Sequence, residues 1–294
     1  MKYLFNKIFL DHNICSEFEG SYRLEDFKDL PDSYFDGEPL LSLVHSAGHI
    51  EAIKRACENN ETLAEIRLSP VSYRAACLAA GLTVLAAENG DFAIVRPPGH
   101  HAFRDKAAGF CLFNNMAIAA TRLADKGKKV FVFDIDGHHG DGTQNIFYDD
   151  PRVFYCSVHQ QNTFPFTGTF MEIGAGKGIG TTLNIPIAEN SGEKEFLKAV
   201  DKAVAAAKKF GADVIGVSAG FDGYRKDRIL NLLYSPHAFY ECGYRLGRHF
   251  GNVFAVLEGG YHEDLRMCAD LFMEGVNKGM KPTKIKWNPE LSVG

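Results

Sequence analysis

Short apolar runs that alternate with helical patterns restrict the fold of this chain more than any other feature. Each run is rich in Val, Ile and Phe, which is typical of strands covered on both faces of a sheet. Strands that alternate with helices predict an α/β fold with a mainly parallel sheet and helices on both of its faces. The predicted strands are 92–95, 130–135, 153–158, 182–185, 214–218 and 253–257.

Capping residues mark the helices between these strands. Ser69 followed by Pro70 is typical of a helix N-terminus and predicts a helix that continues to about Glu88. No linker interrupts the pattern, so we expect a single domain over residues 1–294 with a motif-bearing core at about 40–275. Glycines at 127, 211 and 251 predict the ends of three more helices, over 115–126, 193–210 and 236–250.

Composition argues against several classes of protein. The net charge of −5 does not suggest a nucleic-acid binder, and no uninterrupted apolar run reaches the roughly 18 residues of a membrane span. The seven cysteines are scattered and form no C-x-x-C pair, which argues against a disulfide framework or a cysteine-rich zinc site. The N-terminal segment lacks the apolar core and cleavage site of a signal peptide, so we expect a cytoplasmic protein.

Reactive side chains follow directly after the predicted strands. RPPGHH follows the first, DGHHGDG the second, SVHQ the third, SAGFD the fifth and EGGY the last. In open α/β sheets ligands bind at the carboxyl ends of the strands. Polar surface turns would favour Asn, Ser and Lys over five histidines, so these segments predict a functional site at this edge.

Three of these side chains form a candidate metal site. Asp136 and His138 are two residues apart, so an extended backbone directs both to one side. Carboxylate and imidazole are suitable zinc ligands, and a catalytic zinc takes about three protein ligands and a water. Asp222 is the third candidate. In the alternative reading, Asp136 and His138 only pair with each other and cap a helix.

Two histidines and a tyrosine can supply acid–base and oxyanion chemistry. Amide hydrolysis needs a base for the attacking water and an acid for the leaving amine, and His100 and His101 can serve as both if their protonation states differ. Asp134 and Asp141 are candidates to orient them. Tyr261 follows two glycines and can donate to an oxyanion opposite the metal, or is simply a buried tyrosine.

Five motifs in order identify a resemblance to a known family. They are RPPGHH (96–101), GFCLFNN (109–115), DIDGHHGDGTQ (134–144), SAGFD (218–222) and LEGGY (257–261). Together they resemble the histone deacetylase and acetylpolyamine amidohydrolase superfamily over roughly residues 40–275. The motifs SAGFD and LEGGY resemble the forms found in its bacterial, class II-like branch. The resemblance implies an arginase-like α/β/α sandwich with a parallel sheet of about eight strands.

The resemblance also implies roles for individual residues. It makes Asp136, His138 and Asp222 the zinc ligands, pairs His100 with Asp134 and His101 with Asp141, and makes Tyr261 the residue that polarises the substrate carbonyl. It assigns Gly109 and Phe110 to the acyl-lysine channel, with Phe164 or Phe166 as the opposite wall. A structural K⁺ or Na⁺ ion is implied at Asp134, Asp136, His138, Ser157 and Val158.

Three segments depart from the family pattern. SEFEGSYRLEDF stands where many members have His-Pro-Glu-Xaa-Pro, and residues 164–168 read FPFTG in place of Tyr-Pro-Gly-Thr-Gly. Asp-Arg-Ile-Leu at 227–230 replaces Asp-Pro-Leu-Gly. These segments lie at the expected channel rim, so they bear on substrate choice and oligomer contacts and leave the catalytic set intact.

The expected function is removal of an acetyl or other short acyl group from an acyl-lysine or acyl-polyamine-like amine by a metal-activated water. Asp/His/Asp ligation suits Fe²⁺ as well as Zn²⁺. The alternatives are an arginase-like ureohydrolase with two manganese ions and a non-catalytic binder on the same fold. A nucleotide-binding module is disfavoured because GAGKGIG (174–180) matches neither phosphate-binding fingerprint.

Other conspicuous residues are assigned structural roles. Cys111 is expected to pack beside the site and His159 to be structural. The histidines predicted to lie on the surface or at helix caps are His45, His49, His237, His249 and His262.

Overall fold

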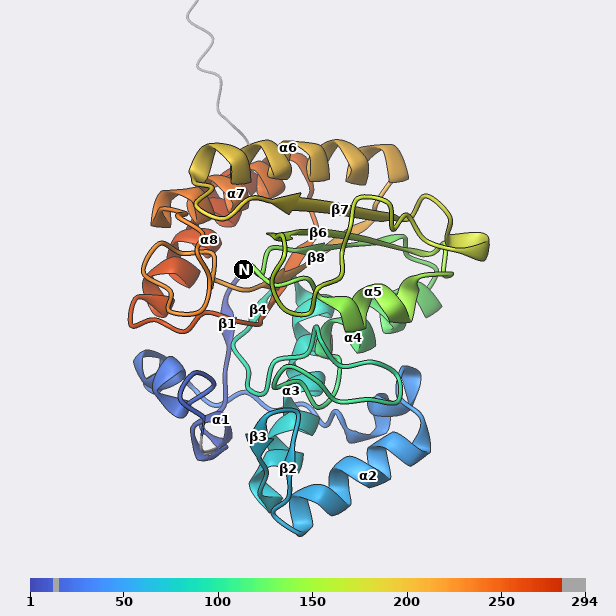
Figure 1. Cartoon of the computed structure of the whole chain (residues 1–294), viewed down its shortest axis with the longest axis vertical. Helices are drawn as coiled ribbons and strands as arrows, with labels where there is room; N and C mark the ends of the chain where they lie inside the picture. The colour runs from blue at the N-terminus through green and yellow to red at the C-terminus, as the bar shows by residue number, and fades with distance from the viewer. Residues whose placement is uncertain (13–15, 282–294) are drawn as a thin grey trace, which may run out of the picture.

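Seven parallel strands lie side by side in the order β1-β4-β9-β8-β5-β6-β7 in the computed structural model, which describes residues 1–12 and 16–281 (Figure 1). Every hydrogen-bonded neighbour pair in this sheet is parallel. The strands are β1 (Tyr3–Leu4), β4 (Phe92–Ala93), β5 (Val130–Asp134), β6 (Val153–Gln160), β7 (Thr182–Ile187), β8 (Val214–Ala219) and β9 (Val253–Leu257).

Helices cover both faces of the sheet, so the predicted three-layer α/β/α architecture is confirmed (Figure 1). One layer holds α3 (Pro70–Asn89), α4 (Asn115–Asp125) and α5 (Asp141–Phe147), and the other holds α6 (Glu193–Phe210), α7 (Pro236–His249) and α8 (Leu265–Met280). Outside these layers lie α1 (Ile8–Asp11), α2 (Ala47–Glu58), the 3-10 helices η1 (Ser21–Phe27), η2 (Glu38–Leu43) and η3 (Gly176–Gly178), and the antiparallel hairpin of β2 (Thr62–Leu63) and β3 (Ile66–Arg67).

All six predicted strands are present, with small differences at their ends. Ser69 is the N-cap residue of α3, where its backbone N–H donates to the Ser72 hydroxyl at 3.0 Å, and Gly90 ends that helix at φ +72°. Gly211 ends α6 in the same conformation, as predicted. The sequence patterns missed β1, because a strand of two residues is too short to show any periodicity.

Helix α3 is the one helix, among those in the described ranges, that is long and apolar enough to cross a membrane. Its polar residues interrupt every apolar run, so run length alone did not reveal it. In the fold, 72 % of its apolar window is buried against the rest of the chain, as expected of a core helix.

The six cysteines in the described part of the chain are buried and free. Three histidines contradict the prediction of surface or capping positions, because His45, His49 and His262 are buried. Each ring hydrogen-bonds a backbone carbonyl, of Arg104, Leu112 and Phe221 respectively. Burying an imidazole requires such partners, and the partners come from distant segments that sequence patterns do not reveal.

Candidate active site

The sheet register brings the reactive segments to one edge. Asp134 at the end of β5 is level with Ser157 of β6 and Ser218 of β8. Ser218 is in turn level with Val256 of β9. Because all these strands run parallel, the loops that follow them meet at the carboxyl edge of the sheet, where the predicted site residues lie.

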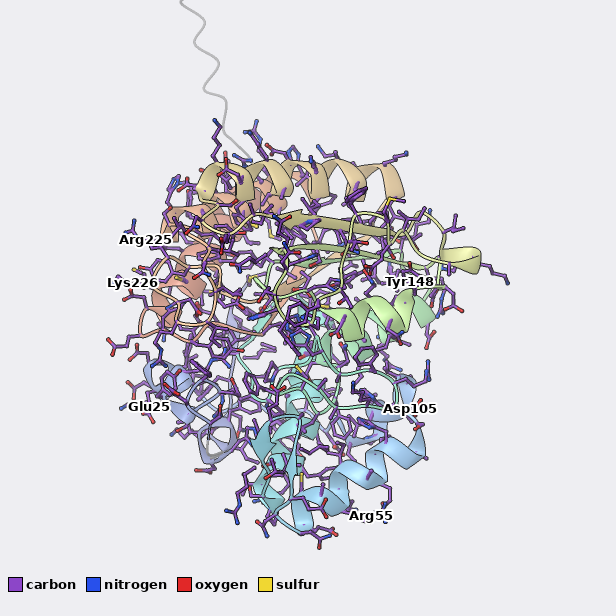
Figure 2. All side chains as sticks on the ribbon, in the orientation of Figure 1. Glu25, Arg55, Asp105, Tyr148, Arg225 and Lys226 are labelled. Carbon is purple, nitrogen blue, oxygen red and sulfur yellow. The ribbon has the colours of Figure 1, made fainter. Side chains whose placement is uncertain are left out.

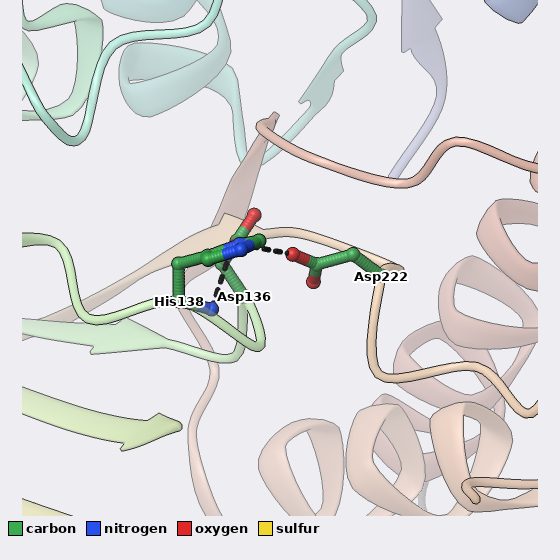
Figure 3. A group of neighbouring side chains, drawn as sticks. All are labelled: Asp136, His138 and Asp222. Carbon is green, nitrogen blue, oxygen red and sulfur yellow. Dashed lines mark hydrogen bonds and ion pairs between the residues drawn. The ribbon is translucent and has the colours of Figure 1, made fainter. Parts of the chain in front are cut away.

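Asp136, His138 and Asp222 converge in a buried cluster (Figure 3). One potential ligand atom from each lies within 4.8 Å of the other two. His138 Nδ1 lies 2.6 Å from Asp222 Oδ2 and 3.3 Å from Asp136 Oδ1. The backbone N–H of Gly259 donates to Asp136 at 2.8 Å, and that of Gly137 donates to Asp222 at 2.6 Å, so both carboxylates are held in place.

Two glycines, one from each of the SAGFD and LEGGY segments, make room for this cluster. A Cβ atom at Gly220 would collide with the Asp136 carboxylate, and one at Gly259 would lie 2.6 Å from Asp136 Oδ2. The SAGFD and LEGGY segments therefore need glycine at these positions because the backbone passes directly against a ligand candidate.

The charges of the cluster fit a divalent cation. Burial and the neighbouring Asp136 raise the pKa of Asp222 to about 7. Burial opposes a charged His138, but its hydrogen bonds to Asp136 and Asp222 raise its pKa to about 10. The single positive charge of a protonated His138 thus lies between two buried carboxylates, those of Asp136 and Asp222. The donor set matches Zn²⁺ and also Fe²⁺, and either ion would neutralise both carboxylates.

The tandem histidines contact the two aspartates that the resemblance pairs with them. His100 Nδ1 lies 3.1 Å from Asp134 Oδ2, and His101 Nδ1 lies 2.7 Å from Asp141 Oδ1. Burial opposes a charged His100, yet Asp136 and Asp134 hold its pKa well above the ordinary value. Burial and the charge on His100 lower the pKa of His101 to about 4. The surroundings therefore favour the charged form of His100 and the neutral form of His101.

A cavity of about 460 Å³ leads from the surface to this site. His101, His138 and Tyr261 line its inner end. Phe164 also lines it, with its ring centroid 5.0 Å from that of His101. Phe166 does not line it, and this residue is 78 % exposed. The remaining lining residues are Ser16, Glu17, Phe18, Glu65, Gly109, Phe110 and Ile229.

One wall of the cavity depends on two successive left-handed residues. Gly109 and Phe110 have φ values of +51° and +67°. A Cβ atom at Gly109 would lie 2.5 Å from the His101 ring, so glycine is required there. The N–H of Phe110 donates to the carbonyl of Ala64 at 3.0 Å, which docks the β2–β3 hairpin against this wall.

Tyr261 lies at the inner end of the cavity with its phenol protonated. Burial raises its pKa well above the ordinary value, so the hydroxyl can donate a hydrogen bond. The guanidinium of Arg23 lies 4.8 Å from the centre of its ring and donates to the carbonyls of Gly260 and Glu258. Arg23 was not predicted, because its partners lie more than 230 residues away in sequence.

Glu258 is a second residue that the motifs did not single out. Its buried carboxylate accepts the backbone N–H groups of Gly99 and His100 at 2.7 and 3.1 Å. Its other oxygen accepts from the Ser218 hydroxyl at 3.0 Å. Glu258 therefore fixes the loop that carries the tandem histidines. Its place in the LEGGY motif was the available signal.

The other predicted residues have structural contacts. Asp134 also accepts from the Tyr155 hydroxyl and from the N–H of Asp136. Ser157 hydrogen-bonds His159. Cys111 is buried, and its thiol donates to the Gly109 carbonyl at 3.2 Å, beside the cavity wall.

Comparisons with known proteins place the chain in a family. Residues 23–276 match the histone deacetylase domain. The chain belongs to the histone deacetylase family. It is 36 % identical to "Histone deacetylase 10, chloroplastic" of Oryza sativa subsp. japonica, over 85 % of this chain and 62 % of that protein. It is 40 % identical to the acetylpolyamine amidohydrolase of Burkholderia pseudomallei, over 67 % of this chain and 59 % of that protein.

Solved structures agree with this assignment. The HDA15 HD domain superimposes with a TM-score of 0.86 at 29 % identity, covering 95 % of this chain and 96 % of that one. An acetylpolyamine aminohydrolase from Burkholderia pseudomallei gives a TM-score of 0.81 at 29 % identity, covering 95 % and 99 %. The chain spans about three fifths of the length of the curated relatives above.

Proposed function

We propose that this protein is a metal-dependent amidohydrolase that removes an acetyl or other short acyl group from an acylated primary amine, such as acyl-lysine or acyl-polyamine. The observation that carries the proposal is the cavity itself. Its aromatic walls end at His101, His138 and Tyr261, directly beside a buried Asp/His/Asp cluster. Family membership supports the same chemistry.

Asp136, His138 and Asp222 would hold Zn²⁺ or Fe²⁺, and a structural K⁺ or Na⁺ would lie at the backbone and side chains around Asp134 and Ser157. When bound, the divalent ion polarises the substrate carbonyl and acidifies a water molecule. The remaining chemistry comes from side chains of the chain.

His101 suits the proton transfers. It lines the cavity and is neutral, so it can accept a proton from the attacking water. Once protonated, the same ring can give that proton to the leaving amine. The carboxylates of Asp136 and Asp134 favour the charged form of His100. The phenol of Tyr261 donates to the oxyanion that develops on the carbonyl oxygen.

The walls of the cavity suit an aliphatic stem. Phe110 and Phe164 provide aromatic surface on the way to the reacting centre, and apolar surface of this kind favours burial of methylene groups. The Gly109 carbonyl is proposed to accept from the substrate amide.

An arginase-like ureohydrolase is the second candidate that the fold allows. In the described residues, Asp136, His138 and Asp222 are the one group of three suitable side chains close enough to hold a metal. Asp134 and Asp141, which a second ion would need, already contact His100 and His101. These contacts favour a site for one ion.

Turnover of the metal-loaded protein on defined substrates tests the proposal. We expect release of acetate from acetyl-lysine peptides or acetylated polyamines and no release of urea from arginine. Urea release, or inactivity on every acylated amine in a panel of different acyl lengths, would refute it.

A further inference from the structure

Two consecutive residues hold the backbone of Tyr261 from both sides. Asp227 Oδ2 accepts the N–H of Tyr261 at 2.7 Å, and Arg228 Nε donates to the carbonyl of the same residue at 3.0 Å. The other oxygen of Asp227 accepts the N–H of Ile229 at 2.8 Å, which closes a tight turn. Both hydrogen-bonding groups of one residue are thus fixed by a single short segment.

The backbone before Tyr261 needs such an anchor. Gly259 and Gly260 precede it, and Gly260 has a φ of +117°. Two successive glycines permit many backbone conformations, and each would send the phenol to a different place. The stacking of Arg23 on the ring restrains the side chain, whereas the hydrogen bonds from Asp227 and Arg228 restrain the backbone that carries it.

The segment that supplies this anchor is itself held at its outer side. Figure 2 shows Arg225 and Lys226 on the outside of the molecule, and Lys226 pairs with Asp264 at 2.7 Å. Arg228 Nη2 donates to the Tyr22 hydroxyl at 2.8 Å, and its guanidinium lies 5.9 Å from the centre of the Phe18 ring. Arg228 therefore connects the Tyr261 loop to the N-terminal segment.

Both of these connecting segments depart from the family pattern. A proline at the position of Arg228, as in Asp-Pro-Leu-Gly, has no side-chain donor. The hydrogen bond from Arg228 to the Tyr261 carbonyl therefore depends on the arginine that this chain has at position 228.

We propose that Asp227 and Arg228 are positioning residues that clamp the backbone of Tyr261 and fix its phenol for the developing oxyanion. The inference rests on the proposed function, because it assigns Tyr261 the role of oxyanion donor. A rival role for Asp227 is support of the metal cluster, since Asp222 lies close enough for the charge of Asp227 to raise its pKa. The two roles differ in what their loss would change.

A double-mutant cycle on the metal-loaded full chain separates them. Tyr261→Phe should lower kcat by about 10²- to 10³-fold, and Asp227→Ala by roughly 10- to 100-fold with an unchanged KM and unchanged bound metal. If Asp227 acts through the phenol, Asp227→Ala should cost nothing further in the Tyr261→Phe background. An equal loss in both backgrounds, or loss of metal, would overturn the clamp.

Arg228→Ala tests the other arm with little risk to folding, because this side chain lies at the surface. It should lower kcat without changing KM, and this loss too should vanish in the Tyr261→Phe background. Arg225→Ala is the matched control, since Arg225 is an exposed arginine of the same segment, and it should keep full activity. Full activity of Arg228→Ala would overturn the role of that arm. Full activity of Tyr261→Phe would instead refute the oxyanion role in the proposed function.

Discussion

The rings of His100 and His101 lie with their centroids 4.0 Å apart, and their surroundings shift their pKa values in opposite directions. Asp134 and Asp136 favour the charged form of His100, while burial and that charge favour the neutral form of His101. Adjacent titratable groups whose pKa values are driven apart indicate a division of acid–base labour. Here the neutral ring is the one that lines the cavity.

The first prediction concerns this division. His101→Ala should lower kcat by about 10²- to 10⁴-fold, because it removes the ring that exchanges protons with water and amine. His100→Ala should lower kcat less, since His100 does not line the cavity and its proton stays between two carboxylates. Steady-state kinetics at equal metal content compares them. A larger loss in His100→Ala would contradict the assignment.

The second prediction concerns the metal ligands. Asp222→Ala should lose the divalent ion on dialysis, because it leaves only Asp136 and His138 to bind it. Asp264→Ala serves as the control, since Asp264 is a surface carboxylate paired with Lys226, and it should retain one ion per chain. Elemental analysis after dialysis measures both. A stoichiometric ion in Asp222→Ala would show that Asp222 is not a ligand.

The third prediction concerns stability at acid pH. Burial lowers the pKa of His45 to about 4, and its Nε2 accepts the N–H of Asn114 at 2.9 Å, which only the neutral ring can do. Between about pH 6.5 and pH 4, His45 is therefore protonated in the unfolded chain but neutral in the folded chain. As the pH is lowered through this window, this group should reduce the free energy of unfolding by about 1.4 kcal/mol per pH unit.

His45→Gln keeps a neutral donor and acceptor at this position and should remove that share of the pH dependence. Denaturant unfolding of both proteins at several pH values measures the difference. Equal slopes for the two proteins would mean that His45 titrates normally in the folded state.

The fourth prediction concerns the exposed aromatic at the channel rim. Phe166 has a φ of +64° and is 78 % exposed, so burial does not offset its backbone strain. Phe166→Gly should raise the free energy of unfolding by about 0.5–1 kcal/mol, because relief of left-handed strain outweighs the added entropy of glycine in the unfolded chain. Phe170→Gly, at an equally exposed residue without positive φ, should not stabilise. Stabilisation by both, or by neither, would count against strain at Phe166.

The fold and the metal cluster could be predicted because local sequence patterns indicate them. The residues that hold the Tyr261 loop could not be predicted in this way. Long apolar strands such as β5 and β6 are recognisable in the sequence, and the metal cluster was predictable because Asp136 and His138 lie within one motif. The roles of Arg23 and Asp227 could not be predicted from the sequence. Each acts through contacts with the Tyr261 loop, and a contact across the sheet edge leaves no local pattern in the sequence.

Phe164 and Phe166 show the same limit on a smaller scale. Both flank Pro165 in an aromatic segment, so either could have formed the channel wall. Only the three-dimensional course of the loop places Phe164 against His101 and leaves Phe166 in solvent.

The most direct test of the central claim is acetate release from an acetylated amine measured against the number of divalent ions bound per chain. The metal-free protein should be inactive, and turnover should rise in proportion to bound metal and saturate at one Zn²⁺ or Fe²⁺ per chain. Saturation only at two ions, or turnover that does not depend on metal, would contradict a deacylase built on Asp136, His138 and Asp222.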